Sequence, residues 1–230
     1  WYLPVTVARG GVGRLPAPES LGIVAVGVTA GTVVATAAAF LLFLRALDLG
    51  AVSYVAPISK IIPVFVLPIE VLVLRARLAP IQVVGVAVAT LAVYVANYRT
   101  GPLLDPLRKA ATARSAQFAL ASAACFAVGD VGKRLVLQEF ALPLTVWVPV
   151  LLGGVLVVVF PLAAREWVPL RDAAPRFVLA GAGVAVAEHA TSVAFSVVPA
   201  SVASPIINTQ AVVAVVLGGV VLREAFFGIR

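Results

Sequence analysis

The run LGIVAVGVTAGTVVATAAAFLLFL, residues 21–44, contains no charged residue. It is longer than the roughly 20 residues that an α-helix needs to cross a bilayer core of about 30 Å. Comparable apolar runs occupy residues 51–74 and 201–222. Because hydrocarbon offers no partner for free backbone N–H and C=O groups, we expect these runs to be transmembrane helices.

The composition of the chain points to the same class. Of the 230 residues, 62% are hydrophobic and 12% are charged, and the mean hydropathy is +1.11. A soluble domain of this size could not bury so much apolar surface. The net charge of +7 would suggest nucleic acid in a soluble chain, but the basic residues lie mainly between the apolar runs, where they meet anionic headgroups. We therefore expect a lipid bilayer as the partner, and no nucleic acid.

The apolar runs predict seven transmembrane helices. They lie near residues 21–44, 51–74, 79–98, 115–132, 142–163, 176–198 and 201–222. The longest connector, residues 99–114, contains glycine, two prolines and a basic cluster, and it is the natural linker between two halves. We therefore expect a first partial repeat at 1–98 and a second at 115–230. Because the chain holds no methionine and opens on a short apolar stretch, we expect terminal helices to be missing.

Metal and enzymatic sites are not predicted. Cys125 is the single cysteine and His189 the single histidine, which excludes an intramolecular disulfide and a Cys/His metal cluster. The sequence has no HExxH motif, no GxSxG elbow and no Cys/His pair with plausible spacing. We expect no catalytic residues and no cofactor.

An internal repeat supports the division into halves. The segment SYVAPI at residues 53–58 is echoed by SVASPI at 201–206, at an offset of 148 residues (205 − 57). At the same offset, apolar residues meet apolar residues as far as Leu74 and Leu222, and Arg75 meets Arg223. Internal duplication is a common way to build transporters, with the substrate site between the repeats near the membrane midplane.

These segments also resemble a known family. LDLGAVSYVAPI at residues 47–58, PVFVL at 63–67 and LAPIQ at 78–82 resemble one repeat of the EamA-type drug/metabolite transporters, and the second copy is similar through Glu224. The resemblance implies an all-α, polytopic transmembrane helix bundle of two inverted repeats with about five helices each. This chain would hold three helices of the first repeat and four of the second. Ala76 departs from the glutamate that often closes the fourth helix in this family.

Polar residues inside the predicted helices mark a candidate cavity. An ionisable group at a helix centre costs at least about 2.5–3.5 kcal/mol unless it faces protein or water. Lys60 lies roughly 15 Å into its helix at about 1.5 Å per residue. Ser53 and Lys60 are predicted to share a helix face, as are Ser201, Ser204 and Asn208 in the second repeat. The two stripes would line a shared cavity; the alternative is helix packing in which these groups hydrogen-bond without touching substrate.

Glu188 and His189 are candidates for proton coupling. They are adjacent in the middle of the helix at 176–198, and both imidazole and a poorly hydrated carboxylate can titrate near physiological pH. The alternative is a buried pair that satisfies local hydrogen bonds. Glu70 is a further coupling candidate, and on one continuous helix it would lie too far from Lys60 to pair with it. Asp130 and Lys133 are expected to contact each other or the headgroups.

Three prolines are candidates for gating. Pro57, Pro63 and Pro205 lie inside predicted helices, where each removes a backbone hydrogen bond and can create a bend. The orientation of the chain stays open, because the positive-inside rule and the family resemblance place opposite sides in the cytoplasm.

The sequence as a whole predicts a secondary-active transporter in the plasma membrane. It would export small metabolites or drugs by alternating access, with proton coupling as a further hypothesis and a homodimer as one expected assembly. The positive charge of Lys60 favours an anionic or zwitterionic metabolite over a cationic drug. The alternative is a non-transporting membrane scaffold or assembly subunit, whose intramembrane polar groups would be dry and mutually satisfied.

Overall fold

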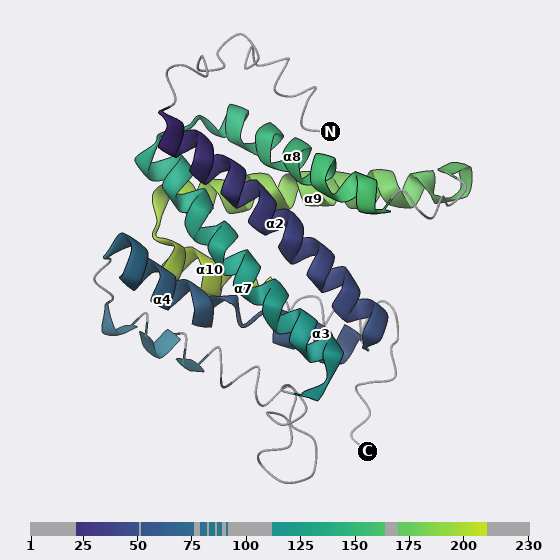
Figure 1. The fold of residues 1–230 in the computed structure, drawn as a ribbon, viewed down its shortest axis with the longest axis horizontal. Helices are drawn as coiled ribbons and strands as arrows, with labels where there is room; N and C mark the ends of the chain where they lie inside the picture. Colours follow the sequence, from purple (N-terminus) through teal and green to yellow (C-terminus); the bar gives the residue numbers. More distant parts are fainter. Residues whose placement is uncertain are drawn as a thin grey trace. The chain divides into compact units, whose positions relative to one another are not determined.

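A computed structural model describes residues 22–50, 52–75, 79–91 apart from 82, 86, 89 and 90, 112–163 and 170–210. The regular structure in these residues is helical throughout, which confirms the predicted all-α class (Figure 1). The helices are α2 Ile23–Leu49, α3 Val52–Ser59, α4 Ile62–Leu74, α7 Arg114–Arg134, the π-helix η3 Leu135–Glu139, α8 Leu144–Ala163, α9 Leu170–Val197 and α10 Ala200–Asn208. Within these residues, three helical stretches are long and apolar enough to cross a membrane: Ile23–Leu49, Leu144–Leu162 and Phe177–Val197.

The predicted helix at 51–74 is wrong as a single element, because it is divided into α3 and α4. The interruption lies at Lys60 and Ile61. Pro63 has no N–H to donate to the carbonyl of Ser59, and its ring disfavours a continuous helix. The chain tightens instead: the N–H of Ile61 donates to the oxygen of Ile58 at 3.3 Å, and the N–H of Val64 donates to the oxygen of Ile61 at 2.9 Å.

This interruption also corrects the predicted face shared by Ser53 and Lys60. Lys60 lies in the turn beyond the last residue of α3, so the two residues are not on one continuous helix. The predicted distance between Lys60 and Glu70 assumed one continuous helix, so it does not apply either. The side chains of Ser53 and Pro57 lie outside the described side chains.

A similar tightening occurs where α10 ends. The N–H of Thr209 donates to the oxygen of Ile206 at 3.2 Å, at the offset of 148 residues from the Ile61–Ile58 bond (209 − 61). The first residues of α3 and α10 are also 148 apart (200 − 52). The local geometry of the two segments is therefore alike, while the inverted two-repeat topology stays a prediction.

The other predicted helices agree closely with the structure where it describes them. Those expected near 21–44, 115–132, 142–163 and 176–198 correspond to α2, α7, α8 and α9, with α2 ending later, at Leu49, and α9 beginning earlier, at Leu170. The helix expected at 79–98 lies partly outside the described residues, as does the end of the one expected at 201–222.

The chain divides into two compact units. Unit 1 comprises residues 1–38 and 128–200, and unit 2 comprises residues 39–127 and 201–230. Both units draw on segments before and after the connector at 99–114, and α2 and α7 each contribute one part to either unit.

In unit 1, small residues bring α2 close to its neighbours. Gly129 and Gly132 on α7 face Thr36 and Thr32 on α2, and Gly154 on α8 faces Val33. Glycine and threonine allow close backbone approach between membrane helices, where van der Waals packing replaces the hydrophobic effect. Helices α8 and α9 also contact each other and η3, and Figure 1 shows α8 and α9 running side by side.

In unit 2, small and β-branched side chains form the core. Ala46 of α2, Val55 and Ile58 of α3, and Ala116 and Ala119 of α7 are all buried in one cluster. Near this cluster the hydroxyl of Ser122 donates to the backbone oxygen of Ala39 at 2.8 Å.

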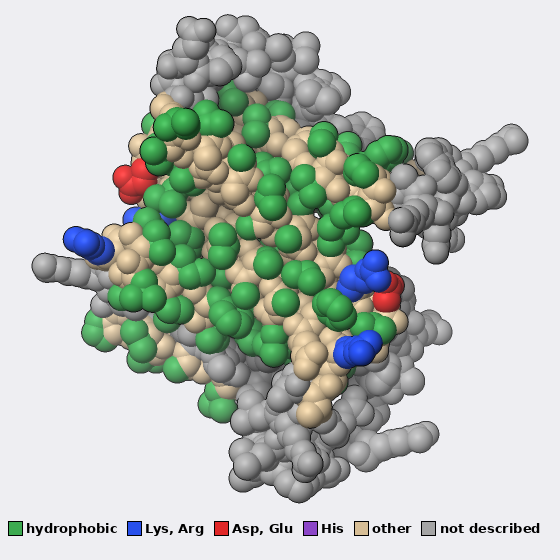
Figure 2. Space-filling view, viewed as in Figure 1, with side chains coloured by type: hydrophobic (Ala, Val, Ile, Leu, Met, Phe, Trp, Pro, Cys, Tyr) green, Lys and Arg blue, Asp and Glu red, His purple; other side chains and the backbone are tan. Residues whose placement is uncertain are grey.

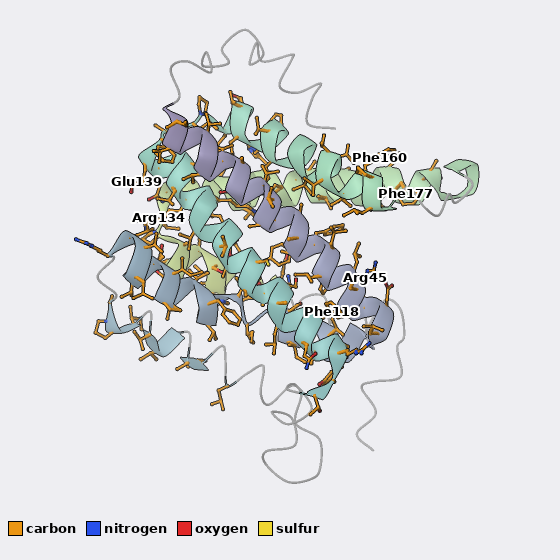
Figure 3. The ribbon with its side chains drawn as sticks, in the orientation of Figure 1. Arg45, Phe118, Arg134, Glu139, Phe160 and Phe177 are labelled. Carbon is orange, nitrogen blue, oxygen red and sulfur yellow. The ribbon has the colours of Figure 1, made fainter. Side chains whose placement is uncertain are left out.

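The outward surface is strongly apolar. Figure 2 shows hydrophobic side chains spread over the visible face of the described residues, with few charged side chains among them. On α8 and α9, Phe160 is 55% exposed and Phe177 58% exposed, and Figure 3 labels both rings. Such a surface suits lipid as its solvent, because large exposed apolar patches are rare in soluble monomers.

Candidate functional site

A buried ion pair joins α7 to α9 in unit 1. The Nζ atom of Lys133 lies 2.8 Å from Oε1 of Glu188, and the two side chains are 6% and 17% exposed. The hydroxyl of Ser192, one turn beyond Glu188 on α9, donates to the same carboxylate oxygen at 3.4 Å. The helical spacing of four residues places Ser192 and Glu188 on one face of α9.

Two further groups adjoin the Lys133 ammonium. Phe195 is fully buried, and its ring centroid lies 6.0 Å from Nζ, at the limit of a cation–π contact. Asp130, one turn before Lys133 on α7, is also buried and is close enough to act on Lys133 electrostatically. The cluster therefore combines one ammonium with two carboxylates, a hydroxyl and an aromatic face.

The end of α9 is fixed by η3. The amide nitrogen of Gln138 donates to the backbone oxygens of Phe195 and Val198, each at 2.8 Å. Phe195 is in the last turn of α9 and Val198 directly follows it, and backbone oxygens at a helix end lack helical partners. Arg134 Nε donates to Oε1 of Gln138 at 3.3 Å, and Figure 3 labels Arg134 and Glu139 at the two ends of this α7–η3 junction. The junction therefore contacts the backbone of Phe195, whose ring lies beside Lys133.

The pairing of Lys133 with Glu188 was missed by sequence reasoning. The sequence predicts that Lys133 contacts Asp130 or the headgroups, because both residues lie near the end of a predicted helix, whereas Glu188 is 55 residues away (188 − 133). The available signal was the presence of opposite charges inside two apolar helices, since such charges seek each other. His189 follows Glu188 and is half-buried, and its role in a proton relay stays a prediction.

In unit 2 a second buried carboxylate meets the start of α10. Glu70 of α4 is fully buried, and its Oε2 accepts a hydrogen bond from the backbone N–H of Ser201 at 3.0 Å. Ser201 is in the first turn of α10, where N–H groups lack helical partners and the helix dipole favours a negative charge. Sequence reasoning placed Glu70 among the coupling candidates but did not predict this contact across 131 residues.

The remaining candidates in unit 2 satisfy one another in part. The side-chain nitrogen of Asn208 donates to the backbone oxygen of Ser204 at 2.7 Å and to its hydroxyl at 3.2 Å, and both residues are buried. Lys60 is half-buried at the α3–α4 interruption. Pro63 is in the first turn of α4, and Pro205 lies inside α10.

The structure thus groups the predicted residues into two clusters. Lys60, Glu70, Ser201, Ser204 and Asn208 belong to unit 2, and Glu188 and His189 belong to unit 1. Within the described part of the chain, no group of three or more His, Cys, Asp or Glu side chains could hold a metal ion.

One comparison with known proteins matches part of the chain to a family model. Residues 9–98 match the model of the EamA-like transporter family, and the matched segment includes α2, the α3–α4 interruption and the buried Glu70. The comparisons with curated proteins and with solved structures gave no match. The match confirms the resemblance read from residues 47–82, and with the apolar helices it indicates an integral membrane protein. Residues 9–98 are thus similar to the EamA-like transporter family, and this similarity suggests a membrane transporter.

Proposed function

We propose that the protein is a secondary-active transporter that exports small metabolites or drugs across the plasma membrane by alternating access. The observation that carries this proposal is the interruption between α3 and α4 inside the segment that matches the EamA-like family. Transporter folds commonly form their substrate sites at discontinuous helices near the membrane midplane.

The chemistry at the interruption supports a substrate site. Non-helical backbone at membrane depth is tolerated where it is buried in protein or lines a water-filled cavity. Lys60 lies at this point with its side chain half-buried, and the tightening at Thr209 repeats the geometry after α10. A lysine at this depth favours a substrate with a negative group, so an anionic or zwitterionic metabolite fits better than a cationic drug.

Proton coupling is a part of the proposal that rests on Glu188. Its carboxylate is largely buried and ion-paired, so gain of a proton would change the partners of Lys133 as well as its own. Breaking a buried ion pair in this way can shift the equilibrium between two packing arrangements of α7 and α9. A homodimer in the membrane belongs to the same proposal, with exposed apolar faces of α8 and α9 free to meet lipid or a second copy.

One set of contacts favours the alternative of a non-transporting scaffold. Asn208 bonds to Ser204 one turn away, and Glu70 bonds to Ser201, as expected of polar groups that stabilise helix packing. The two functions differ in whether Lys60 and Glu188 matter for substrate movement.

Efflux by the full-length protein distinguishes them. Cells preloaded with a panel of radiolabelled amino acids and organic acids would be compared for wild type, Lys60→Ala, Glu188→Gln and the control Ser196→Ala, whose hydroxyl bonds to Val193 of its own helix turn. For an exported compound we expect the first two variants to be at least about tenfold slower, or about 1.4 kcal/mol in barrier. Unchanged efflux in both, at equal membrane insertion, would contradict the proposal.

A further inference from the structure

We propose that Lys133 and Glu188 form a site that binds an anion and a proton together, at which a carboxylate of the substrate replaces the carboxylate of Glu188 beside Lys133. In this exchange Glu188 takes up one proton and becomes a neutral acid, and the substrate carboxylate binds the Lys133 ammonium. The inference rests on the proposed transport function and names its substrate class: small organic acids with one carboxylate next to an apolar body.

Separation of Lys133 from Glu188 is costly. Lys133 Nζ and Glu188 Oε1 are 2.8 Å apart, and the two side chains are only 6% and 17% exposed, so bulk water is a poor alternative partner for either charge. Removal of one partner of a buried ion pair leaves an uncompensated charge, which is strongly unfavourable. Lys133 therefore keeps an anion beside it, and a carboxylate from outside is chemically equivalent to the one it replaces.

Glu188 becomes neutral once Lys133 has another anion as its partner. A buried carboxylate without its cation becomes neutral by binding a proton, because burial penalises the charged form. The charge of the cluster is then the same before and after exchange: one carboxylate leaves the pair as an acid, and another enters. Anion binding and proton uptake are thereby linked at a single site.

The surroundings of the pair suit an organic anion. The Ser192 hydroxyl is buried beside the Glu188 carboxylate and can donate to an oxygen that replaces it. Phe195 provides an apolar ring at 6.0 Å from Nζ. The other titratable or charged residues near the pair are Asp130, Arg134 and Glu139 on α7 and η3, and His189 on α9. Helix α8 and residues 23–38 of α2 contribute no titratable group.

Asp130 distinguishes the exchange from simple binding of a second anion. Its charge already acts on Lys133, so an anion that entered while Glu188 was ionised would meet two carboxylates around one ammonium. Like charges at short range disfavour that state, whereas protonation of Glu188 removes one of them.

The test uses benzoate as the probe and the neutral benzamide as its control, with the full-length protein in nanodiscs. Benzoate affinity and proton uptake would be measured from pH 5.5 to 8.5 by calorimetry in buffers of different ionisation enthalpy. If one proton binds with each benzoate, the benzoate dissociation constant of wild type should rise about tenfold per pH unit. This holds over the pH range in which Glu188 is ionised in the benzoate-free protein. Glu188→Gln should bind benzoate with no such slope and no proton uptake.

The double variant Lys133→Leu/Glu188→Leu, in which both charges are removed together, should lose benzoate binding. Equal pH slopes in wild type and Glu188→Gln would overturn the exchange, as would undiminished binding to the double variant or the absence of binding to both wild type and Glu188→Gln. These outcomes are separate from the efflux assay, so transport by another site would still be recognised.

Discussion

Replacement of Lys133 alone by leucine is expected to lower the free energy of unfolding by about 3–5 kcal/mol at pH 8. Lys133 is 5% exposed, and its ammonium compensates the charge of Glu188 at 2.8 Å. Leucine fills a similar volume but leaves that carboxylate buried without its cation. Titration with sodium dodecyl sulfate in mixed micelles, followed by circular dichroism, measures the loss.

The matched control is Lys133→Leu combined with Glu188→Leu. Replacement of both partners of a buried ion pair by apolar residues is often neutral or stabilising, so the double variant should recover most of the stability. Recovery is expected although Ser192 loses its acceptor on Glu188, because that bond is 3.4 Å long and weak. A double variant as unstable as Lys133→Leu would contradict mutual compensation within this pair.

Gly132→Ala is expected to destabilise the protein by about 1–3 kcal/mol through overpacking between α7 and α2. An added Cβ would overlap the hydroxyl of Thr32 and lie 3.0 Å from both its Cβ and its Cγ2. Thr32 has little freedom to move, because its hydroxyl donates to the oxygen of Val28 at 2.7 Å and its χ1 is stiff. The thermal midpoint of the purified protein measures the effect.

Gly153→Ala provides the comparison for this variant. A Cβ at Gly153 of α8 meets nothing within 4 Å, so the same substitution should leave stability unchanged or raise it by about 0.5–1 kcal/mol through helix propensity. Truncation of the clashing side chain in Thr32→Ala/Gly132→Ala should restore much of the loss. If Gly132→Ala behaved like Gly153→Ala, the close approach of α2 and α7 at Thr32 would be wrong.

The helix content could be predicted from the sequence because lipid imposes a simple pattern. Residues 21–44 and 142–163 are long apolar runs, and both are helices: the second has nearly the expected bounds, and the first continues to Leu49. The interruption at Lys60 was missed because apolar residues continue on both sides, so hydropathy is the same for one helix or two. Pro63 was the informative residue, because its missing N–H helps to end one helix and start another; its role in gating stays a prediction.

The candidate site was less predictable because its contacts are long-range. Glu188 and Glu70 were recognised as costly intramembrane charges, but their partners Lys133 and Ser201 lie 55 and 131 residues away. Spacing along one helix shows which residues share a face, as for Glu188 and Ser192. It does not show which face of another helix packs against them. The small-residue contacts of Gly129 and Gly132 with α2 escaped for the same reason.

The most direct test of the transporter assignment is the accessibility of positions 60 and 208 to water. Single cysteines would replace Lys60 and Asn208 in the full-length protein with Cys125 substituted, and a membrane-impermeant thiol reagent would be applied to each side separately. We predict labelling at both positions, because a substrate pathway must admit water to the ends of α3 and α10 as the cavity opens. Protection of both cysteines from both sides would contradict this and favour the membrane scaffold.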